Sequence, residues 1–272
     1  MTIISASMRT DIPAFHHRKF LRQLEAGNLE YTNPYTKNRY SIKRDDIDCI
    51  VFWSKNYEHL IPKLHILDSY GIKYYFQFTI NGYPFSIEPN VPDVMESVRQ
   101  VYDITMHNSN IPIIWRYDPI IITKEFTPEW HVNHFDFIAD QLCILGDGAI
   151  TQCTISFVDM YNKTKNAFKD AGIEVYDYLE VQKKVACDLS DIAKEYGIEV
   201  SACCEDSIRF NAYGDELIKK AHCIDPELIT KLIGKPFEFS KSTSRKECGC
   251  VKTVDIGEYG TCQHSCIYCY AK

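Results

Sequence analysis

Three cysteines near the end of the chain have the spacing of a metal-binding motif. Five of the twelve cysteines fall in the last 25 residues, and three of them, Cys262, Cys266 and Cys269, form a C-x3-C-x2-C triplet. In a reducing compartment, clustered thiols are metal ligands more often than they are disulfides. The triplet suits three of the four irons of a [4Fe–4S] cluster and leaves the fourth iron open to an exogenous ligand.

Zinc is the alternative occupant of this motif. A closed structural zinc site takes four protein ligands, so three cysteines alone match it less well. Cys248 or Cys250 would then have to supply the fourth ligand. The sequence leaves both metals open.

Four further cysteines suggest a second metal site. These are Cys203 or its neighbour Cys204, then Cys223, Cys248 and Cys250, so two come from the tail and two from the preceding domain. A metal bound there would staple the tail to that domain, and four thiolates suit either zinc or an auxiliary [4Fe–4S] cluster. The alternative is that Cys203, Cys204 and Cys223 are small buried apolar residues. The remaining cysteines are expected in the core: Cys49, Cys143, Cys153 and Cys187.

Charged or amide side chains follow every predicted strand of the main domain. Parallel α/β barrels place their chemistry at the carboxyl ends of their strands. We expect a polar pocket there for an anionic or zwitterionic ligand, although strand ends that enter solvent loops also carry charge. The anchoring cations would be Arg9, Lys55 and Arg116. The expected catalytic residues are Arg9, Asp11, Lys55, Arg116, Asp118 and Glu205, and Gln77 and Asp159 are expected to contact a cofactor.

These side chains can converge only if parallel strands position them, and the pattern of apolar residues predicts such strands. Short segments that are apolar on both faces are typical of buried parallel strands, and helical apolar spacing separates them. Six such β–α units predict an α/β fold, a (β/α) barrel of the TIM type, complete or partial; a doubly wound open sheet is the alternative. The predicted strands are Ile3–Ser7, Cys49–Trp53, Tyr74–Thr79, Ile111–Trp115, Thr151–Phe157 and Glu199–Cys204.

Two segments depart from this alternation. Asn28–Arg44 indicates an inserted hairpin or lid, and Gly234–Arg245 is polar and without period, as in a linker. We therefore expect a barrel domain at residues 1–234 and a Cys-rich, metal-binding or Fe–S-binding tail at residues 235–272.

Composition sets the class of protein. The 272 residues are 45% hydrophobic and 13% aromatic, enough for a sizeable core, which excludes a disordered chain. The net charge of −7 makes nucleic acid an unlikely partner. No apolar run reaches the ~18 residues of a membrane span, and the N-terminus does not read as a signal peptide, so we expect a soluble cytoplasmic protein.

The tail motif also resembles a known one. The segment Tyr259–Ala271 resembles the cluster motif of radical S-adenosylmethionine (SAM) enzymes, most closely the spore photoproduct lyase-like branch. The resemblance implies that Cys262, Cys266 and Cys269 hold a [4Fe–4S] cluster, that SAM chelates its open iron, and that Tyr268 packs near the adenine. In that superfamily the triplet follows the first strand, whereas here it follows six β–α units. The tail must therefore fold back over the barrel, or the fold is permuted. The Gly-Gly-Glu that holds the SAM amino group is not found after the second strand.

The whole chain resembles the bacterial domain of unknown function 1848 family. The matching segments are Arg9–Pro13, Cys49–Asn56 and Cys223–Asp225.

Together these features predict an iron–sulfur, SAM-dependent radical enzyme acting on an unidentified small molecule. The resemblance implies an electron donor of the flavodoxin or ferredoxin type. Two alternatives stay open: a barrel lyase or hydrolase with a structural zinc in the tail, and a non-catalytic Fe–S redox sensor.

Overall fold

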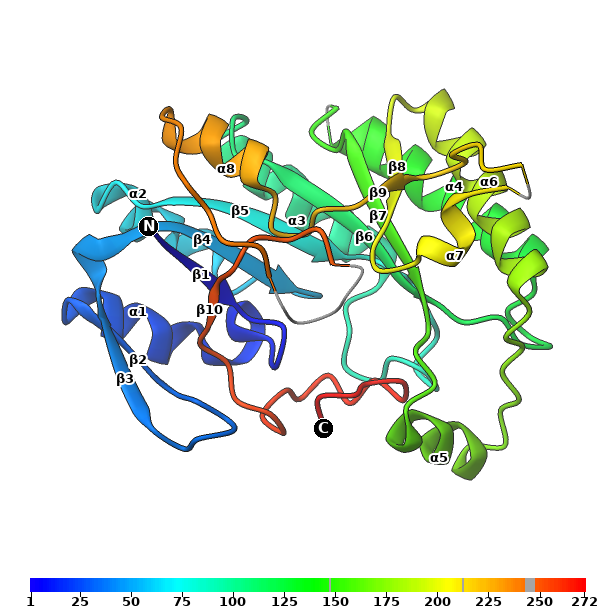
Figure 1. Ribbon diagram of the computed structural model, residues 1–272, viewed down its shortest axis with the longest axis horizontal. Helices are drawn as coiled ribbons and strands as arrows, with labels where there is room; N and C mark the ends of the chain where they lie inside the picture. The colour runs from blue at the N-terminus through cyan, green and yellow to red at the C-terminus, as the bar shows by residue number, and fades with distance from the viewer. Residues whose placement is uncertain (147, 212, 243–247) are drawn as a thin grey trace.

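The computed structural model describes residues 1–146, 148–211, 213–242 and 248–272. A mostly buried parallel sheet forms its centre (Figure 1). The strands of this sheet are β1 (Thr2–Ala6), β4 (Ile47–Ser54), β5 (Lys73–Thr79), β6 (Ile113–Ile120), β7 (Gln152–Phe157), β8 (Glu199–Ala202), β9 (Lys219–Lys220) and β10 (Val254–Asp255).

From β1 to β9 the strands of this sheet follow chain order, and β10 lies beside β1, which gives the order β10-β1-β4-β5-β6-β7-β8-β9. Every neighbouring pair is parallel. A doubly wound sheet reverses its strand order at a switch point, and no reversal occurs between β1 and β9. The prediction of an α/β fold with a parallel sheet is confirmed. Among the described residues no pairing joins β9 to β10, so the strand pairs do not show a closed barrel.

Helices connect most of these strands. Thr127 caps α4 by accepting from the Trp130 amide, and Asp93 caps α3 by accepting from the Glu96 amide, as expected of N-cap residues. The helices are α1 (His17–Glu25), α2 (Leu64–Ser69), α3 (Val94–His107), α4 (Pro128–Leu145), α5 (Asn162–Asp170), α6 (Leu179–Glu195), α7 (Asp206–Arg209) and α8 (Pro226–Ile233), with short turns of other helix types at η1 (Ile12–His16), η2 (Arg44–Asp46) and η3 (Ile61–Lys63).

The insertion predicted at Asn28–Arg44 contains an antiparallel hairpin. Its strands are β2 (Asn28–Thr32) and β3 (Arg39–Lys43), and Asn28 pairs with Lys43. The predicted linker lies only partly within the described residues. Residues 235–242 carry one isolated bridge, from Lys241 to Val251, and the rest of the linker, from residue 243 on, is not described.

The two faces of the sheet bury different partners. Alternate residues such as Phe52, Phe76 and Trp115 pack against α1, α2, α3, α4 and α6 in the larger core. Burial of each such large side chain stabilises the fold by roughly 1.5–3 kcal/mol. The other face, with Val51 and Tyr75, is covered by α8 and by chain segments that carry Cys223, Cys248 and Cys250. In a barrel this second face would be the interior, so the C-terminal part of the chain occupies that side.

After β10 the chain runs to the carboxyl ends of the strands and ends there. Figure 1 shows this last segment, in red, beyond the sheet and near α5. The Lys163 ammonium on α5 donates to the terminal residue's carbonyl oxygen, Lys272 O, at 2.6 Å. The predicted return of the tail over the carboxyl edge of the sheet is therefore observed.

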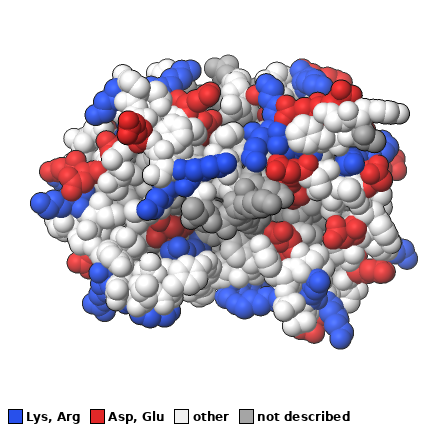
Figure 2. Space-filling view, in the orientation of Figure 1, with Lys and Arg blue, Asp and Glu red and all other residues white. Residues whose placement is uncertain are grey.

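Charged side chains of both signs lie on the visible surface of the molecule (Figure 2). On the face in Figure 2, the described Lys and Arg side chains are interspersed with Asp and Glu. Within the described ranges, no helix combines the length and the apolar character that a membrane crossing requires.

Candidate functional site

The C-x3-C-x2-C loop is tied down at both ends of the motif. The Gly260 amide donates to the Ala271 carbonyl at 2.8 Å, which closes residues 260–271 into a loop. The Ile267 amide donates to Ile87 O at 3.0 Å, and the Asn90 side chain donates to Gln263 O at 2.8 Å. The loop is thus held by the connection between β5 and α3, at the carboxyl edge of the sheet.

The three thiols of this loop influence one another electrostatically. Burial, with Cys269 as a further contributor, raises the pKa of the Cys262 thiol to about 11. Burial also raises the pKa of Cys266 to about 12, although Lys55 acts in the opposite direction. None of the three forms a disulfide. Burial thus favours the protonated thiols of Cys262 and Cys266, and Cys269 lies close enough to influence both.

A buried ion pair lies beside the triplet. The Lys55 ammonium contacts Glu88 Oε1 at 2.9 Å, and the two side chains are 14% and 1% exposed. Burial acts to lower the pKa of Lys55, but attraction to Glu88 and Cys266 outweighs it and raises the pKa above its ordinary value. Tyr268 donates its hydroxyl to the same Glu88 oxygen, and its ring lies 5.6 Å below the ammonium. Lys55 is therefore held charged next to the loop.

Asp118 is the second carboxylate at this edge. It pairs with Arg116, whose Nε donates at 3.1 Å, and it accepts from the Ser156 hydroxyl. Its backbone is clamped by Asn81, which accepts from the Asp118 amide at 2.8 Å and donates to the Asp118 carbonyl at 2.9 Å. Asn81 also donates to Glu88 Oε1 at 3.1 Å, so the two carboxylates belong to one network.

Asp11 joins three segments of the chain. Its buried carboxylate accepts from the Ser54 hydroxyl at 2.7 Å, from the Lys55 amide at 3.0 Å and from the Ala14 amide at 2.9 Å. His264, inside the cysteine loop, places Nε2 2.8 Å from Asp11 Oδ2. Asp11 thus links the segment after β1, the end of β4 and the tail loop, and so fixes the position of the loop relative to these strands.

Arg9 lies at the same edge but is occupied elsewhere. Its Nη1 donates to Asp255 O at 3.2 Å and lies 3.8 Å from the Asp255 carboxylate, in β10. All three predicted cation anchors, Arg9, Lys55 and Arg116, are therefore paired with carboxylates. A bound anion would therefore have to share each of these cations with the carboxylate that already pairs with it.

The remaining predicted residues, Glu205, Asp159 and Gln77, make contacts with other parts of the fold. Glu205 accepts from the Phe157 amide at 2.9 Å and so ties the end of β7 to the start of α7. Asp159 is exposed and accepts from the Tyr161 hydroxyl at 3.2 Å. Gln77 lies on the sheet face covered by the C-terminal segments, where it donates to Cys223 O at 2.8 Å.

A second group of cysteines surrounds Cys223 on that face. The sulfurs of Cys203 and Cys223 lie 3.1 Å apart, and Arg116 Nη1 lies 3.1 Å from the Cys223 sulfur. Hydrogen bonds from Cys203 and Cys250, together with the guanidinium, lower the pKa of the Cys223 thiol well below its usual value. Cys250 in turn contacts Cys248. The predicted second set is thus assembled, and Arg116 connects it to Asp118.

As the side chains stand, no three or more His, Cys, Asp or Glu groups in the described part of the chain have the arrangement of a metal site. Metal binding at either set would require the thiols to lose protons and turn toward a common centre. Whether the predicted residues bind metal or cofactor therefore stays a prediction.

Sequence patterns did not indicate Glu88, Asn81 or His264. Glu88 lies in a long connection, nine residues past the end of β5, where no periodicity marks it. Asn81 follows β5 by two residues and could have been included with the other strand-end side chains. His264 is the histidine between the first two cysteines of the motif, a position that the motif itself offered.

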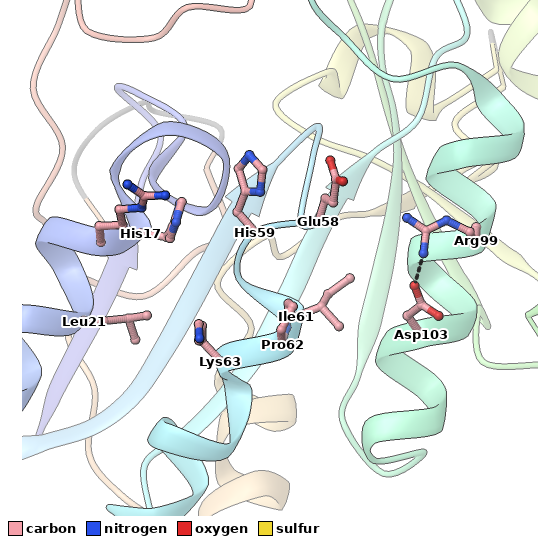
Figure 3. Close-up of a pocket in the computed structure, with 10 residues that line it drawn as sticks. His17, Leu21, Glu58, His59, Ile61, Pro62, Lys63, Arg99 and Asp103 are labelled. Carbon is pink, nitrogen blue, oxygen red and sulfur yellow. Dashed lines mark hydrogen bonds and ion pairs between the residues drawn. The ribbon is translucent and has the colours of Figure 1, made fainter.

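A cavity of about 560 Å³ has no cysteine among the residues that line it (Figure 3). It lies between α1, the segment after β4, and α3. His17 and His59 face each other across it with ring centroids 5.2 Å apart, and Arg99 pairs with Asp103 on its far wall. None of the predicted site residues lines it.

Comparison with known proteins places the chain in a family. The family described as Domain of unknown function (DUF1848) matches residues 3–271. The chain belongs to the DUF1848 family. The match covers both cysteine groups and the carboxyl edge of the sheet, so the DUF1848 unit includes the tail.

One solved structure that the comparison matches is an inactive mutant of the GH20 exo-β-N-acetylglucosaminidase of Vibrio harveyi. The similarity has a TM-score of 0.35 and 14% sequence identity, and it covers 65% of the DUF1848 chain and 39% of the enzyme. The DUF1848 chain therefore spans well under half of that enzyme's length. No curated protein matches the sequence.

Proposed function

We propose that this protein is an iron–sulfur enzyme of the radical-SAM type, acting on a small molecule at the carboxyl edge of the sheet. Cys262, Cys266 and Cys269 would bind three irons of a [4Fe–4S] cluster and leave the fourth for SAM. The observation that carries this proposal is the placement of the C-x3-C-x2-C loop directly against the buried Lys55–Glu88 pair. A cysteine loop with only a structural role would not require a buried ion pair beside it.

The donor set fits this cofactor. Three thiols on one closed loop, in mutual electrostatic contact, can become thiolates when iron replaces their protons. The nearby Lys55 ammonium offsets part of the negative charge that a thiolate-bound cluster carries.

The residues beside the loop also fit the methionine end of SAM. That group carries an ammonium and a carboxylate. Glu88 Oε2 is buried and has no hydrogen-bond partner among the described residues, so it can accept from an ammonium. Lys55 can donate to a carboxylate while it keeps its contact with Glu88 Oε1. We assign to this pair the role of the Gly-Gly-Glu segment, which is not found after the second predicted strand.

Apolar side chains around the loop limit the access of water. Tyr83, Ile87, Ile121 and Phe126 form a buried cluster against which Ile267 and Tyr268 pack. When bound, the [4Fe–4S] cluster and SAM would supply the one-electron cleavage of a C–S bond of SAM. The carbon radical formed by this cleavage would abstract hydrogen from the substrate. The protein's own part is to bind SAM through Lys55 and Glu88 and to exclude solvent. An electron donor of the flavodoxin or ferredoxin type would deliver the electron.

The proposal is tested by iron and sulfide analysis of protein purified and reconstituted without oxygen. We expect about four irons and four sulfides per chain at this motif, and release of 5′-deoxyadenosine from SAM under reduction. A Cys266→Ala variant should lose both, whereas Cys143→Ala, which changes an exposed cysteine on α4, should retain them. Protein that stays colourless after reconstitution would overturn the proposal, and a cluster that never cleaves SAM would indicate a redox sensor.

A further inference from the structure

The second cysteine group has the composition of a metal site and joins three distant segments. Cys203 follows β8, Cys223 precedes α8, and Cys248 and Cys250 precede β10. All four lie on the sheet face opposite the larger core, within or packed against the smaller apolar cluster of that face.

The sulfurs of this group contact one another as well as apolar side chains. The Cys203 and Cys223 sulfurs are 3.1 Å apart, Cys223 and Cys250 are hydrogen-bonded through their thiols, and Cys250 is likewise bonded to Cys248. A buried cysteine that serves only as a small apolar residue has no requirement for two sulfur neighbours, as Cys223 and Cys250 each have. The contacts therefore form a continuous chain of sulfurs from Cys203 through Cys223 and Cys250 to Cys248, and Cys204 contacts Cys203 at its end.

Polar groups around the set suit thiolates. The Arg116 guanidinium, 7% exposed, lies 3.1 Å from the Cys223 sulfur, and the Ile224 amide donates to the Cys250 sulfur at 3.4 Å. A buried cation and a backbone amide aimed at sulfur both favour the charged form. The same outer contacts orient and stabilise the ligands of metal–thiolate sites.

The Cys248-Gly249-Cys250 turn is also constrained. The His222 ring bonds to Gly249 O at 2.8 Å, and a Cβ at position 249 would lie 2.8 Å from that ring. A larger residue at this position would require the His222 ring to move. The two tail cysteines are therefore held in a fixed turn against the segment that carries Cys223.

We propose that Cys203, Cys223, Cys248 and Cys250 bind one zinc ion, which fastens the tail to the sheet. Four sulfurs at about 2.3 Å from a tetrahedral zinc lie roughly 3.8 Å from one another. The observed Cys203–Cys223 contact needs to lengthen by only about 0.7 Å to reach that value. A [4Fe–4S] cube binds each thiolate at a separate iron and keeps the sulfurs farther apart, so direct sulfur contacts favour a single ion.

The test measures zinc and iron in full-length protein purified without oxygen, in a Cys262→Ala/Cys266→Ala/Cys269→Ala background. That background removes the cluster of the proposed function, so the two ideas fail independently. We expect about one zinc per chain in the background, and a loss of at least tenfold when Cys223→Ser and Cys250→Ser are added. Cys153→Ser, a change at a buried cysteine in the larger core, is the matched control and should retain the zinc.

A second measurement covers variants that do not fold. In the same background, titration of the folded protein with a thiol-binding mercurial should release about one zinc as the four ligand thiols react, in addition to accessible thiols such as that of Cys143. Cobalt exchanged into the site should show tetrahedral thiolate bands. About four irons in place of zinc, no bound metal, or a Cys203–Cys223 disulfide found by mass spectrometry would each overturn the proposal.

Discussion

At the residue scale, the buried Lys55–Glu88 pair is the most demanding feature of the site. Both charges are removed from water, so each depends on the other. Replacement of Glu88 by Gln leaves the Lys55 ammonium buried without its counter-charge. We expect Glu88→Gln to lower the free energy of unfolding by about 3 kcal/mol, measured by urea denaturation.

The double variant Lys55→Met/Glu88→Gln serves as the control for that experiment. Because it removes both charges, it should recover at least half of the lost stability. If Glu88→Gln lowers the free energy of unfolding by less than about 1 kcal/mol, the Lys55–Glu88 pair behaves as a solvated surface pair and not as a buried one.

The thiols of the triplet permit a test by their reactivity. The thiolate is the reactive form, and the pKa of Cys262 is raised from 9.0 to about 11, which is about a hundredfold less thiolate at pH 8. In metal-free protein we expect alkylation of Cys262, followed by mass spectrometry, to accelerate about tenfold per pH unit through pH 9.5. A rate that levels off near pH 8.5 would contradict the shift.

At the scale of elements, the strands of the main sheet were predictable because their apolar character does not depend on distant contacts. All six predicted strands are present, with ends that coincide with the prediction or differ from it by at most five residues. β9 and β10 have two residues each, too short for any periodicity to mark them. Their existence depends on Ser201 and Ala202 in β8 and on Ile4 and Ser5 in β1, which provide the pairing edges.

The candidate site was predictable where the residue type itself carries the signal. Cysteines are rare enough for both groups to be noticed, and cations after strands indicated Lys55 and Arg116. The sequence analysis also named Asp118, two residues from Arg116, but it did not predict which carboxylate pairs with each cation. Glu88 and Asp255 reach Lys55 and Arg9 through tertiary folding, which no local spacing reveals.

The tail loop is docked through one histidine that contacts two other segments. His264 places Nε2 against Asp11 and Nδ1 2.7 Å from Asn90 O. A hydrogen bond to a charged group is worth about 1.5–3 kcal/mol. In His264→Ala we expect faster amide hydrogen exchange across residues 259–272, while exchange in β5 and β6 is unchanged.

His65→Ala is the control for this prediction, since His65 is exposed on α2. It should leave the tail's exchange as in the parent protein. Equal protection of the tail with and without His264 would show that other contacts, such as the Asn90 and Ile87 bonds, dock the loop on their own.

At the scale of the whole molecule, burial of neutral histidine predicts sensitivity to acid. His131 is fully buried between Tyr117 and Ile121, and burial lowers its pKa from 6.5 to about 4. Between those pH values the unfolded chain binds a proton that the folded chain does not, so stability falls as pH falls through this window. The loss amounts to about 3 kcal/mol at pH 4.

The measurement is the free energy of unfolding at pH 7 and at pH 4 in the parent protein and in His131→Gln. Carboxylates titrate in both, so the difference between the two isolates the histidine. The variant should be less stable at pH 7 but lose about 3 kcal/mol less on acidification. An identical pH dependence would show that His131 does not contribute.

The two cysteine groups are connected through the whole fold. Cys250 leads within four residues to β10, which pairs with β1, and the chain then reaches Cys262. Arg116 contacts Cys223 at one group and Asp118 at the carboxyl edge. A metal at the second group would therefore order the strand that positions the first.

The central claim is that the C-terminal triplet holds an iron–sulfur cluster with one iron open to SAM, and electron paramagnetic resonance tests it most directly. Protein purified without oxygen and reduced with dithionite should show the signal of a [4Fe–4S]⁺ cluster. The signal should change when SAM is added and be missing in the triple Cys→Ala variant. A spectrum without that signal, or one that SAM leaves unaltered, would contradict the account.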